Sequence, residues 1–149
     1  MKTAGIALLI FYTLFLPFVA HTQSNQIAIT FDDLPFVNEI SLQNSRENTE
    51  KLMAVLKKYQ VPAIGFVNES GLYRKLGEVD ERIALLEMWL SHGHEIGNHT
   101  YSHPSFNTTS LEAYKADFLK GEKVSSMLTQ KYGSSLRYFR HPFLQTGSD

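Results

Sequence analysis

The chain has 149 residues, of which 43% are hydrophobic and 19% charged, with a formal net charge of -1 and no cysteine. This length accommodates one domain, and the apolar fraction is too high for a disordered chain. The balanced charge leaves no basic excess to hold nucleic acid, and the lack of cysteine excludes disulfides, thiolate zinc sites and cysteine nucleophiles. Any metal site must therefore be built from His, Asp and Glu.

The N-terminus carries an uncharged apolar run over residues 5–20. This run is shorter than the ~20 residues that span a bilayer, and Pro17 near its end is typical of a secretory signal peptide. We predict a signal peptide over residues 1–23 and one domain over residues 24–149. The protein is then secreted or periplasmic and has no stable membrane anchor. The alternative is that the run stays uncleaved as an anchor.

Short apolar runs predict four strands, at residues 26–31, 63–67, 95–97 and 136–139. Helical patterns separate them, which gives the order β-α-β-α-β-α-β. The apolar residues of the strands do not alternate with polar ones. This pattern indicates an α/β fold in which helices cover a parallel sheet.

Three amphipathic helices are predicted between the strands. Their expected caps are Asn44, Asp80 and Thr109, while Pro62 ends the first helix and Gly133 the third. The apolar faces expected to be buried are Leu52, Val55, Leu56 and Tyr59 in the first helix, Ile83, Leu86 and Leu90 in the second, and Leu111, Tyr114, Phe118, Val124 and Leu128 in the third.

Polar clusters follow the predicted strands, where the sites of parallel sheets lie. Asp32 and Asp33 come directly after the first strand. Adjacent side chains at a strand end point in different directions, so one carboxylate can bind a metal while the other stays free as a base. The alternative is a solvated turn or a helix cap.

Four of the six histidines fall within residues 92–103. His99 and His103 are four residues apart, so one helical turn would bring both imidazoles to one face. With Asp33 they predict a two-His, one-Asp site for Zn²⁺ or a similar divalent ion. The alternative is a pair of hydrogen-bonded loop histidines. We interpret His92 and His94 as structural or surface residues, and leave open a contact of His94 near the site.

The third polar cluster is residues 137–143, after the fourth predicted strand. Arg140 could pair with Asp32 and hold that carboxylate ionised and oriented. In isolation, a surface arginine beside a proline turn is the simpler interpretation of Arg140.

Three segments together carry a family resemblance: TFDDLP at 30–35, HTYSH at 99–103 and RHPF at 140–143. In this order and spacing they resemble the first three motifs of the polysaccharide deacetylases, carbohydrate esterase family 4. The resemblance implies the N-terminal part of a deformed (β/α) barrel with parallel strands. It also implies a metal-dependent hydrolase that removes acetyl groups from N-acetylated polysaccharides or oligosaccharides, which is hydrolysis of a non-peptide carbon-nitrogen bond. The expected metal is Zn²⁺, with Co²⁺, Ni²⁺ or Mn²⁺ as alternatives.

The resemblance also implies a role for each site residue. Asp32 would be the general base that takes a proton from the attacking water, and Arg140 would orient it. The backbone N–H of Phe143 would stabilise the tetrahedral oxyanion. The metal ligands would be Asp33, His99 and His103.

The chain departs from the family pattern in three respects. Leu34 stands where the family usually has Gly, and Phe143 where Tyr is common. The later motifs, with the histidine that serves as general acid, are missing, so we expect a chain truncated at its C-terminus. Two alternatives follow: a non-catalytic remnant that binds metal or sugar, or a hydrolase of O-acetyl groups or other non-peptide carbon-nitrogen bonds. The oligomeric state stays open.

Overall fold

The computed structural model describes residues 27–37 and 40–147. The predicted signal peptide lies outside these residues. Three parallel strands form one sheet in the order β1-β2-β3, which confirms the predicted α/β fold with parallel strands. The strands are β1 (Ile29–Leu34), β2 (Ala63–Val67) and β3 (Glu95–Asn98).

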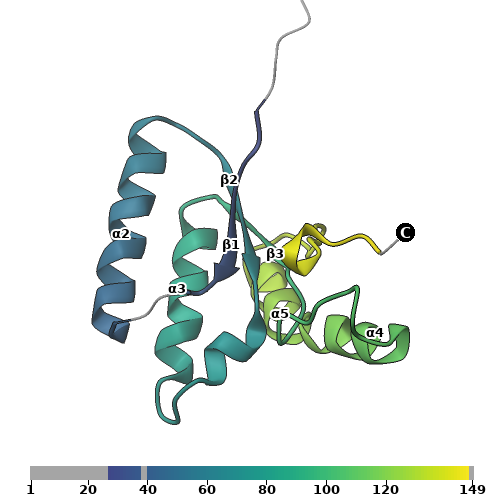
Figure 1. The fold of residues 1–149 in the computed structure, drawn as a ribbon. Helices are drawn as coiled ribbons and strands as arrows, with labels where there is room; N and C mark the ends of the chain where they lie inside the picture. The colour runs from purple at the N-terminus through teal and green to yellow at the C-terminus, as the bar shows by residue number, and fades with distance from the viewer. Residues whose placement is uncertain (1–26, 38–39, 148–149) are drawn as a thin grey trace, which may run out of the picture.

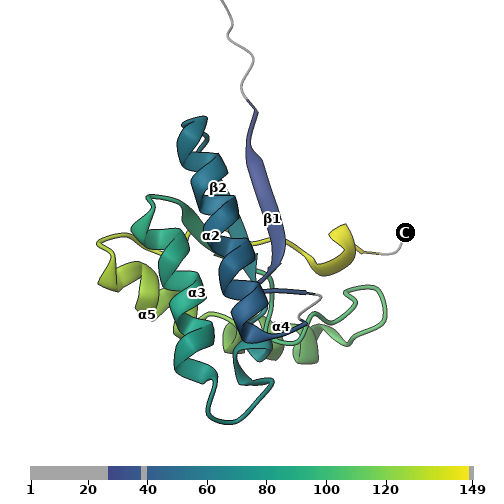
Figure 2. The ribbon, with the colours of Figure 1, turned by 90° about the vertical axis from the view of Figure 1, so that its left-hand side faces the viewer.

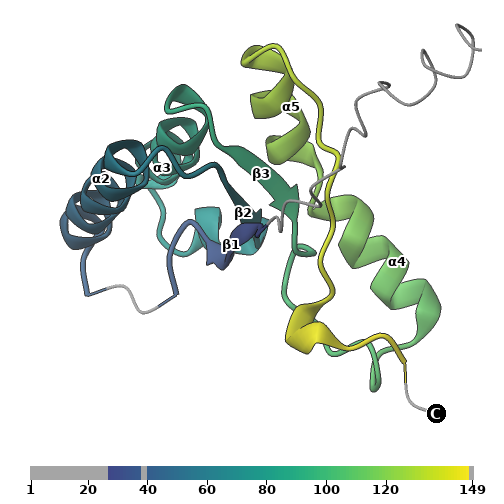
Figure 3. The same cartoon turned by 90° about the horizontal axis from the view of Figure 1, so that it is seen from above.

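Four α-helices and two 3₁₀ turns complete the described fold. They are α2 (Leu42–Lys58), η1 (Glu69–Tyr73), α3 (Val79–Ser91), α4 (Leu111–Lys120), α5 (Lys123–Lys131) and η2 (Pro142–Leu144). Helices α2 and α3 lie side by side on one face of the sheet (Figures 1 and 2). Helices α4 and α5 lie beyond β3, and the C-terminal segment passes beside that strand (Figure 3). None of the helices in the described ranges has the length and apolar character needed to cross a membrane.

The predicted fourth strand is reduced to one bridge beside β3. Asn98 pairs in parallel with Phe139: its N–H donates to the Tyr138 carbonyl at 2.8 Å, and its carbonyl accepts from the Arg140 N–H at 3.0 Å. The prediction of a strand over residues 136–139 was therefore wrong in extent.

The helix starts differ from the predicted ones by one to three residues. Ser41 caps α2, and its Oγ accepts from the N–H of Asn44, which was itself the predicted cap. Ser110 rather than Thr109 caps α4. Helix α3 begins at Val79, so Asp80 lies in its first turn rather than at the cap. A serine that precedes the first helical residue satisfies an N–H that would otherwise lack an acceptor.

The third predicted helix is broken into α4 and α5 at Gly121. A Cβ atom at this position would lie 2.5 Å from the backbone carbon of Thr100 and 2.6 Å from the nitrogen of Tyr101. The loop after β3 thus packs directly against the backbone at Gly121. The break is a tertiary feature, since it depends on a loop that lies about twenty residues earlier.

The core lies between the sheet and the helices, and α2 buries only part of the predicted face, since Leu56 is buried and Leu52 packs against the core as predicted but Val55 and Tyr59 do not. Met53 and Leu56 are buried, whereas Val55 and Tyr59 are 52% and 64% exposed. Leu111 of α4, also predicted to be buried, is exposed. The buried face of α2 includes the small polar residues Ser45 and Thr49, whose hydroxyls bond to the backbone one turn earlier. An apolar pattern does not detect such residues. The other buried apolar residues of this core cluster are Leu34, Ala63, Val67, Leu72, Leu86, Trp89, Leu90, Ile96 and Leu128.

Candidate metal centre

Asp33, His99 and His103 come together at the carboxyl end of the sheet. One potential ligand atom from each residue lies within 4.8 Å of the others, and in the described ranges no other group of three such residues does so. Asp33 is near the end of β1, and both histidines lie in the loop after β3. Asp32 and Asp33 are thus part of the strand rather than residues that follow it.

The distances within this cluster fit a shared divalent ion. Asp33 Oδ1 lies 3.7 Å from His99 Nε2 and 3.5 Å from His103 Nε2. Two ligand atoms that each lie about 2.1 Å from a tetrahedral ion are about 3.4 Å apart, whereas N–H···O hydrogen bonds are ~2.7–3.2 Å long. The spacing therefore suits a common metal better than direct hydrogen bonds between the side chains.

The backbone carbonyl of Arg140 defines the tautomer of His99. It lies 2.8 Å from His99 Nδ1 and can only accept, so Nδ1 carries the proton. The lone pair is then on Nε2, the nitrogen that faces Asp33. A ring nitrogen that donates to a carbonyl while the other faces the metal is the usual arrangement of a histidine ligand.

Burial favours the neutral form of His99. Its side chain is 2% exposed, and desolvation lowers its pKa. The hydrogen bond to the Arg140 carbonyl and the charges of Asp32 and Asp33 oppose this shift only in part. A neutral imidazole is the form that binds a metal ion.

The two histidines are brought together by a strained loop, not by the predicted helical turn. Thr100 and His103 have φ angles of 69° and 60°, and the rings of His99 and His103 meet edge to face at 5.0 Å. A β-branched residue rarely adopts positive φ. Asp33 also has positive φ, at 62°, so the strained backbone gathers at the site.

Hydrogen bonds from three side chains hold this loop. Thr100 Oγ1 accepts from the His103 N–H at 3.1 Å. Asp117 of α4 accepts from the N–H groups of Tyr101 and Ser102, each at 2.9 Å. Asn98 accepts from the Thr100 N–H at 2.6 Å and donates to the carbonyl of Phe118. Contacts with α4 therefore help to hold the loop conformation.

The predicted pair of Arg140 and Asp32 is present beside the cluster. Arg140 Nη1 donates to Asp32 Oδ1 at 2.8 Å and to the hydroxyl of Thr30 at 2.9 Å. Its guanidinium also lies over the ring of Phe66, 4.4 Å from the centroid. Three contacts from two strands thus orient the arginine toward Asp32.

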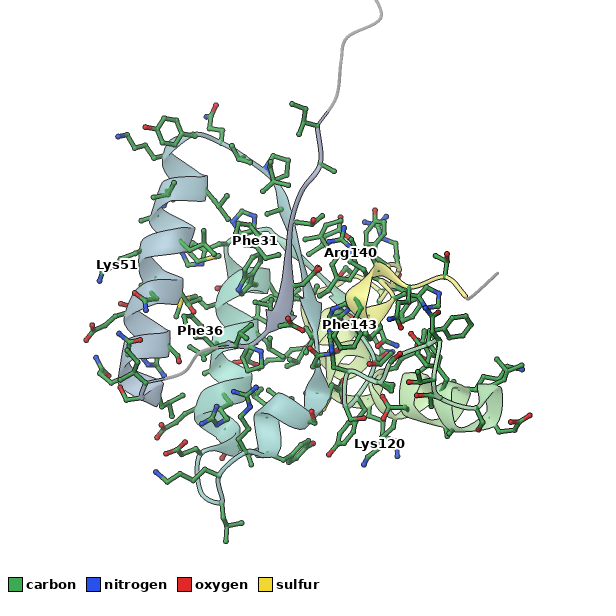
Figure 4. All side chains as sticks on the ribbon, in the orientation of Figure 1. Phe31, Phe36, Lys51, Lys120, Arg140 and Phe143 are labelled. Carbon is green, nitrogen blue, oxygen red and sulfur yellow. The ribbon has the colours of Figure 1, made fainter. Side chains whose placement is uncertain are left out.

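Phe143 lies against the second histidine. Its ring is 4.4 Å from that of His103, edge to face, and its side chain is 62% exposed. Figure 4 shows Phe143 and Arg140 together, where the C-terminal segment passes the sheet. The φ angle of Phe143 is 56°, another left-handed residue at the site.

Two hollows flank Asp33. One, of about 260 Å³, is bordered by His103 and by polar residues that include Asn68 and Arg74. The other, of about 270 Å³, is mostly apolar and is bordered by Phe31 and Trp89. Asp33 thus faces open space on both sides, which gives a ligand room to approach.

His92 and His94 lie at the other end of β3, as predicted. His92 is exposed, and its Nδ1 is 2.8 Å from the Met88 carbonyl. His94 is buried against Trp89, and neither ring nitrogen has a hydrogen-bond partner in the described parts of the chain. His94 therefore makes no contact with the site.

Sequence reasoning missed several residues that support the site. Thr30 and Thr100 lie within the recognised motifs, but the sequence predicted no supporting role for them, for Asp117 or for Asn68. Asn98 is buried and holds the loop. The position of Asn68 and Thr100 could have pointed to them, because each is a polar residue shortly after a predicted strand. Nothing in the pattern of α4 distinguishes Asp117 from a surface aspartate.

Comparison with known proteins identifies the family. The model of the polysaccharide deacetylase family matches residues 20–149. The chain belongs to this family. It is 30% identical over 119 residues to a peptidoglycan-N-acetylglucosamine deacetylase of Bacillus cereus, covering 79% of this chain and 36% of the relative. It is also 30% identical over 130 residues to a chitin deacetylase of Colletotrichum lindemuthianum, covering 86% and 46%. The chain thus spans less than half the length of these relatives.

Solved structures of the family share the fold. A peptidoglycan N-acetylglucosamine deacetylase, Bc1960, superposes with a TM-score of 0.61 at 26% identity, covering 80% of this chain and 47% of that one. A family 4 pseudoenzyme from Bacillus anthracis superposes with a TM-score of 0.62 at 22% identity, covering 84% and 38%. The described residues therefore form part of the family's barrel, as expected. Since a pseudoenzyme shares it, the fold alone does not decide whether a member is catalytic.

Proposed function

We propose that the chain carries the metal centre of a hydrolase that removes acetyl groups from N-acetylated polysaccharides or oligosaccharides. One observation supports this most: the cluster of Asp33, His99 and His103 lies beside the paired Asp32 and Arg140 in a member of the deacetylase family. Relatives act on peptidoglycan and chitin by their names, so an acetylated glycan is the substrate class.

Asp33, His99 and His103 would hold the ion, and Zn²⁺ suits two imidazoles and one carboxylate, with Co²⁺, Ni²⁺ and Mn²⁺ as alternatives. A divalent ion there would polarise the acetyl carbonyl and lower the pKa of the attacking water. The remaining steps fall to the protein. Asp32, held by Arg140 at 2.8 Å, would accept the proton of the water as the carbon–oxygen bond forms and return it to the leaving nitrogen as the carbon–nitrogen bond breaks. The backbone N–H of Phe143 is the candidate donor to the oxyanion.

The test is acetate release by the full chain supplied with Zn²⁺. Substrates are N-acetylglucosamine oligomers and peptidoglycan, and the variants are Asp32→Asn and, as a control, Asp80→Asn on the exposed side of α3. We expect release by the wild type and by the control, and loss in Asp32→Asn. Zinc binding without release from either glycan would contradict the proposal.

The alternative is a member that binds metal without catalysis. A solved pseudoenzyme with the same fold is the observation that favours this alternative. Zinc bound at one equivalent, with no acetate released from either glycan, would support this alternative.

We also propose export of the protein, from the apolar run at residues 5–20 and the polar residues that follow it. Recovery of the protein outside the cytoplasm, shortened near residue 23, would support it. A full-length product retained in the cytoplasm would contradict it.

A further inference from the structure

Asn68 connects the two segments that carry the metal ligands. Its backbone N–H donates to the carbonyl of Leu34, the residue after Asp33, at 3.0 Å. Its side-chain Nδ2 donates to the carbonyl of His99 at 2.6 Å. Asn68 itself follows β2, the central strand of the sheet. One residue thus ties the end of β1 to the start of the histidine loop.

The peptide group between His99 and Thr100 is hydrogen-bonded to two asparagine side chains, one at its carbonyl and one at its N–H. The carbonyl of His99 and the N–H of Thr100 belong to the same peptide unit. The carbonyl accepts from Asn68, and the N–H donates to Asn98 Oδ1 at 2.6 Å. Both asparagines are buried, at 9% and 1% exposure. The plane of this peptide is therefore fixed by two side-chain amides.

This peptide needs such support because of the residue that follows it. Thr100 has a φ of 69°, which is unfavourable for a β-branched side chain. Strain of this kind persists only where the surroundings hold it. This peptide is the first in the loop that runs from His99 to His103. Its orientation therefore affects where the two imidazoles lie relative to Asp33. Relaxation of Thr100 would turn the loop and separate the ligand atoms.

We propose that Asn68 is a positioning residue of the metal centre, which sets the geometry of His99 and His103 relative to Asp33. The inference rests on the proposed metal site. Asn68 also borders the hollow beside Asp33 and His103, yet its role lies in the loop rather than in contact with the ion. Substitution should therefore change metal affinity and ligand geometry while the chain still folds.

The experiment uses the full chain without metal, titrated with Zn²⁺ by calorimetry and with Co²⁺ by visible absorption. Asn68→Leu keeps the branching and approximate volume of the side chain but removes the donor, and Asn68→Ala gives the same comparison if the leucine variant unfolds. Asn107→Leu is the matched control at an exposed asparagine. Met53→Ala controls for stability, because it truncates a core residue of α2, which supplies none of the three ligands.

We expect the Asn68 variants to bind Zn²⁺ about 10- to 100-fold more weakly and to change the Co²⁺ d–d bands, as supporting residues of metal sites do. Asn107→Leu and Met53→Ala should keep the wild-type bands. If both Asn68 variants keep the zinc affinity and the Co²⁺ bands of the wild type, the inference about Asn68 is overturned, while the proposed metal site is not. If Met53→Ala weakens zinc binding as much as the Asn68 variants do, the inference is also overturned, because the zinc affinity would then follow the stability of the fold. Failure of the wild type to bind metal would overturn the proposed site as well.

Discussion

Arg140 contacts His99 through its backbone and Asp32 through its side chain. Its carbonyl oxygen accepts a hydrogen bond from His99 Nδ1 at 2.8 Å, and its Nη1 donates one to Asp32 Oδ1 at 2.8 Å. One residue thus supports both a proposed metal ligand and the proposed base. Because the two contacts use different parts of the residue, a side-chain substitution separates them.

Arg140→Met should lower acetate release and leave zinc affinity close to that of the wild type. The side chain no longer orients Asp32, but the carbonyl still holds His99. General-base catalysis contributes ~10²–10⁴-fold, so we expect a loss of about 10²-fold in kcat. Arg137→Met is the control, since Arg137 pairs with exposed Glu95 at 2.7 Å. A large loss of zinc affinity in Arg140→Met would show that the side chain is needed for the ligand geometry.

His99→Ala should abolish tight zinc binding. It removes one of three ligands and the only one that is fully buried, so we expect affinity to fall by at least about 100-fold. The measurement is calorimetric titration, with His92→Ala as the control because His92 is exposed at the other end of β3. Zinc affinity retained in His99→Ala would contradict the assignment of the ligands.

Gly121→Ala should destabilise the fold and disturb the histidine loop. The added methyl group would lie 2.5 Å from the Thr100 carbon, so the loop must shift. Overpacking of this kind costs about 1–3 kcal/mol of unfolding free energy. Urea denaturation measures the loss, and zinc titration measures the effect on the site. Gly133→Asn is the control, because that position is open and Asn tolerates its φ of 74°. An unchanged stability in Gly121→Ala would refute the close approach.

His94 should make the fold less stable as the pH falls below about 6.5. Burial first, and then the nearby His92, lower the pKa of His94 below its ordinary value. Above about pH 6.5 both states are neutral; below it the unfolded chain takes up a proton that the folded chain does not, so unfolding is favoured. The groups facing His94 are Trp89 and His92, with Lys57 of α2 bordering the same hollow.

The measurement is the free energy of unfolding of the wild type and of His94→Gln between about pH 7.5 and pH 5.5. The buried His99 also has a lowered pKa, but it is present in both proteins, so the difference isolates His94. We expect the wild type to lose more stability than His94→Gln over this range. Parallel curves would mean that His94 is protonated without cost in the folded state.

Local patterns predicted three strands that the structure contains, the helices between them, and the charged residues at the strand ends. Short apolar runs identified the start of β1 and the whole of β2, while β3 was found from the short segment around Ile96. The helices predicted between the strands implied that the strands are parallel. The rule that parallel strands end at a common edge predicted that Asp33 would meet His99 and His103. These features depend on residues that are close in sequence or on a general rule of topology.

The way in which the three proposed ligands are held depends on contacts between distant parts of the chain. The loop from His99 to His103 is not a helical turn, because Asn68, Asn98 and Asp117 bind its peptide groups from three separate elements. The break at Gly121 and the single bridge at Phe139 also depend on contacts between distant segments. Hydrogen bonds between residues far apart in the chain leave no periodic trace in the sequence. The sequence therefore determined which residues could form the site, and long-range packing determined their geometry.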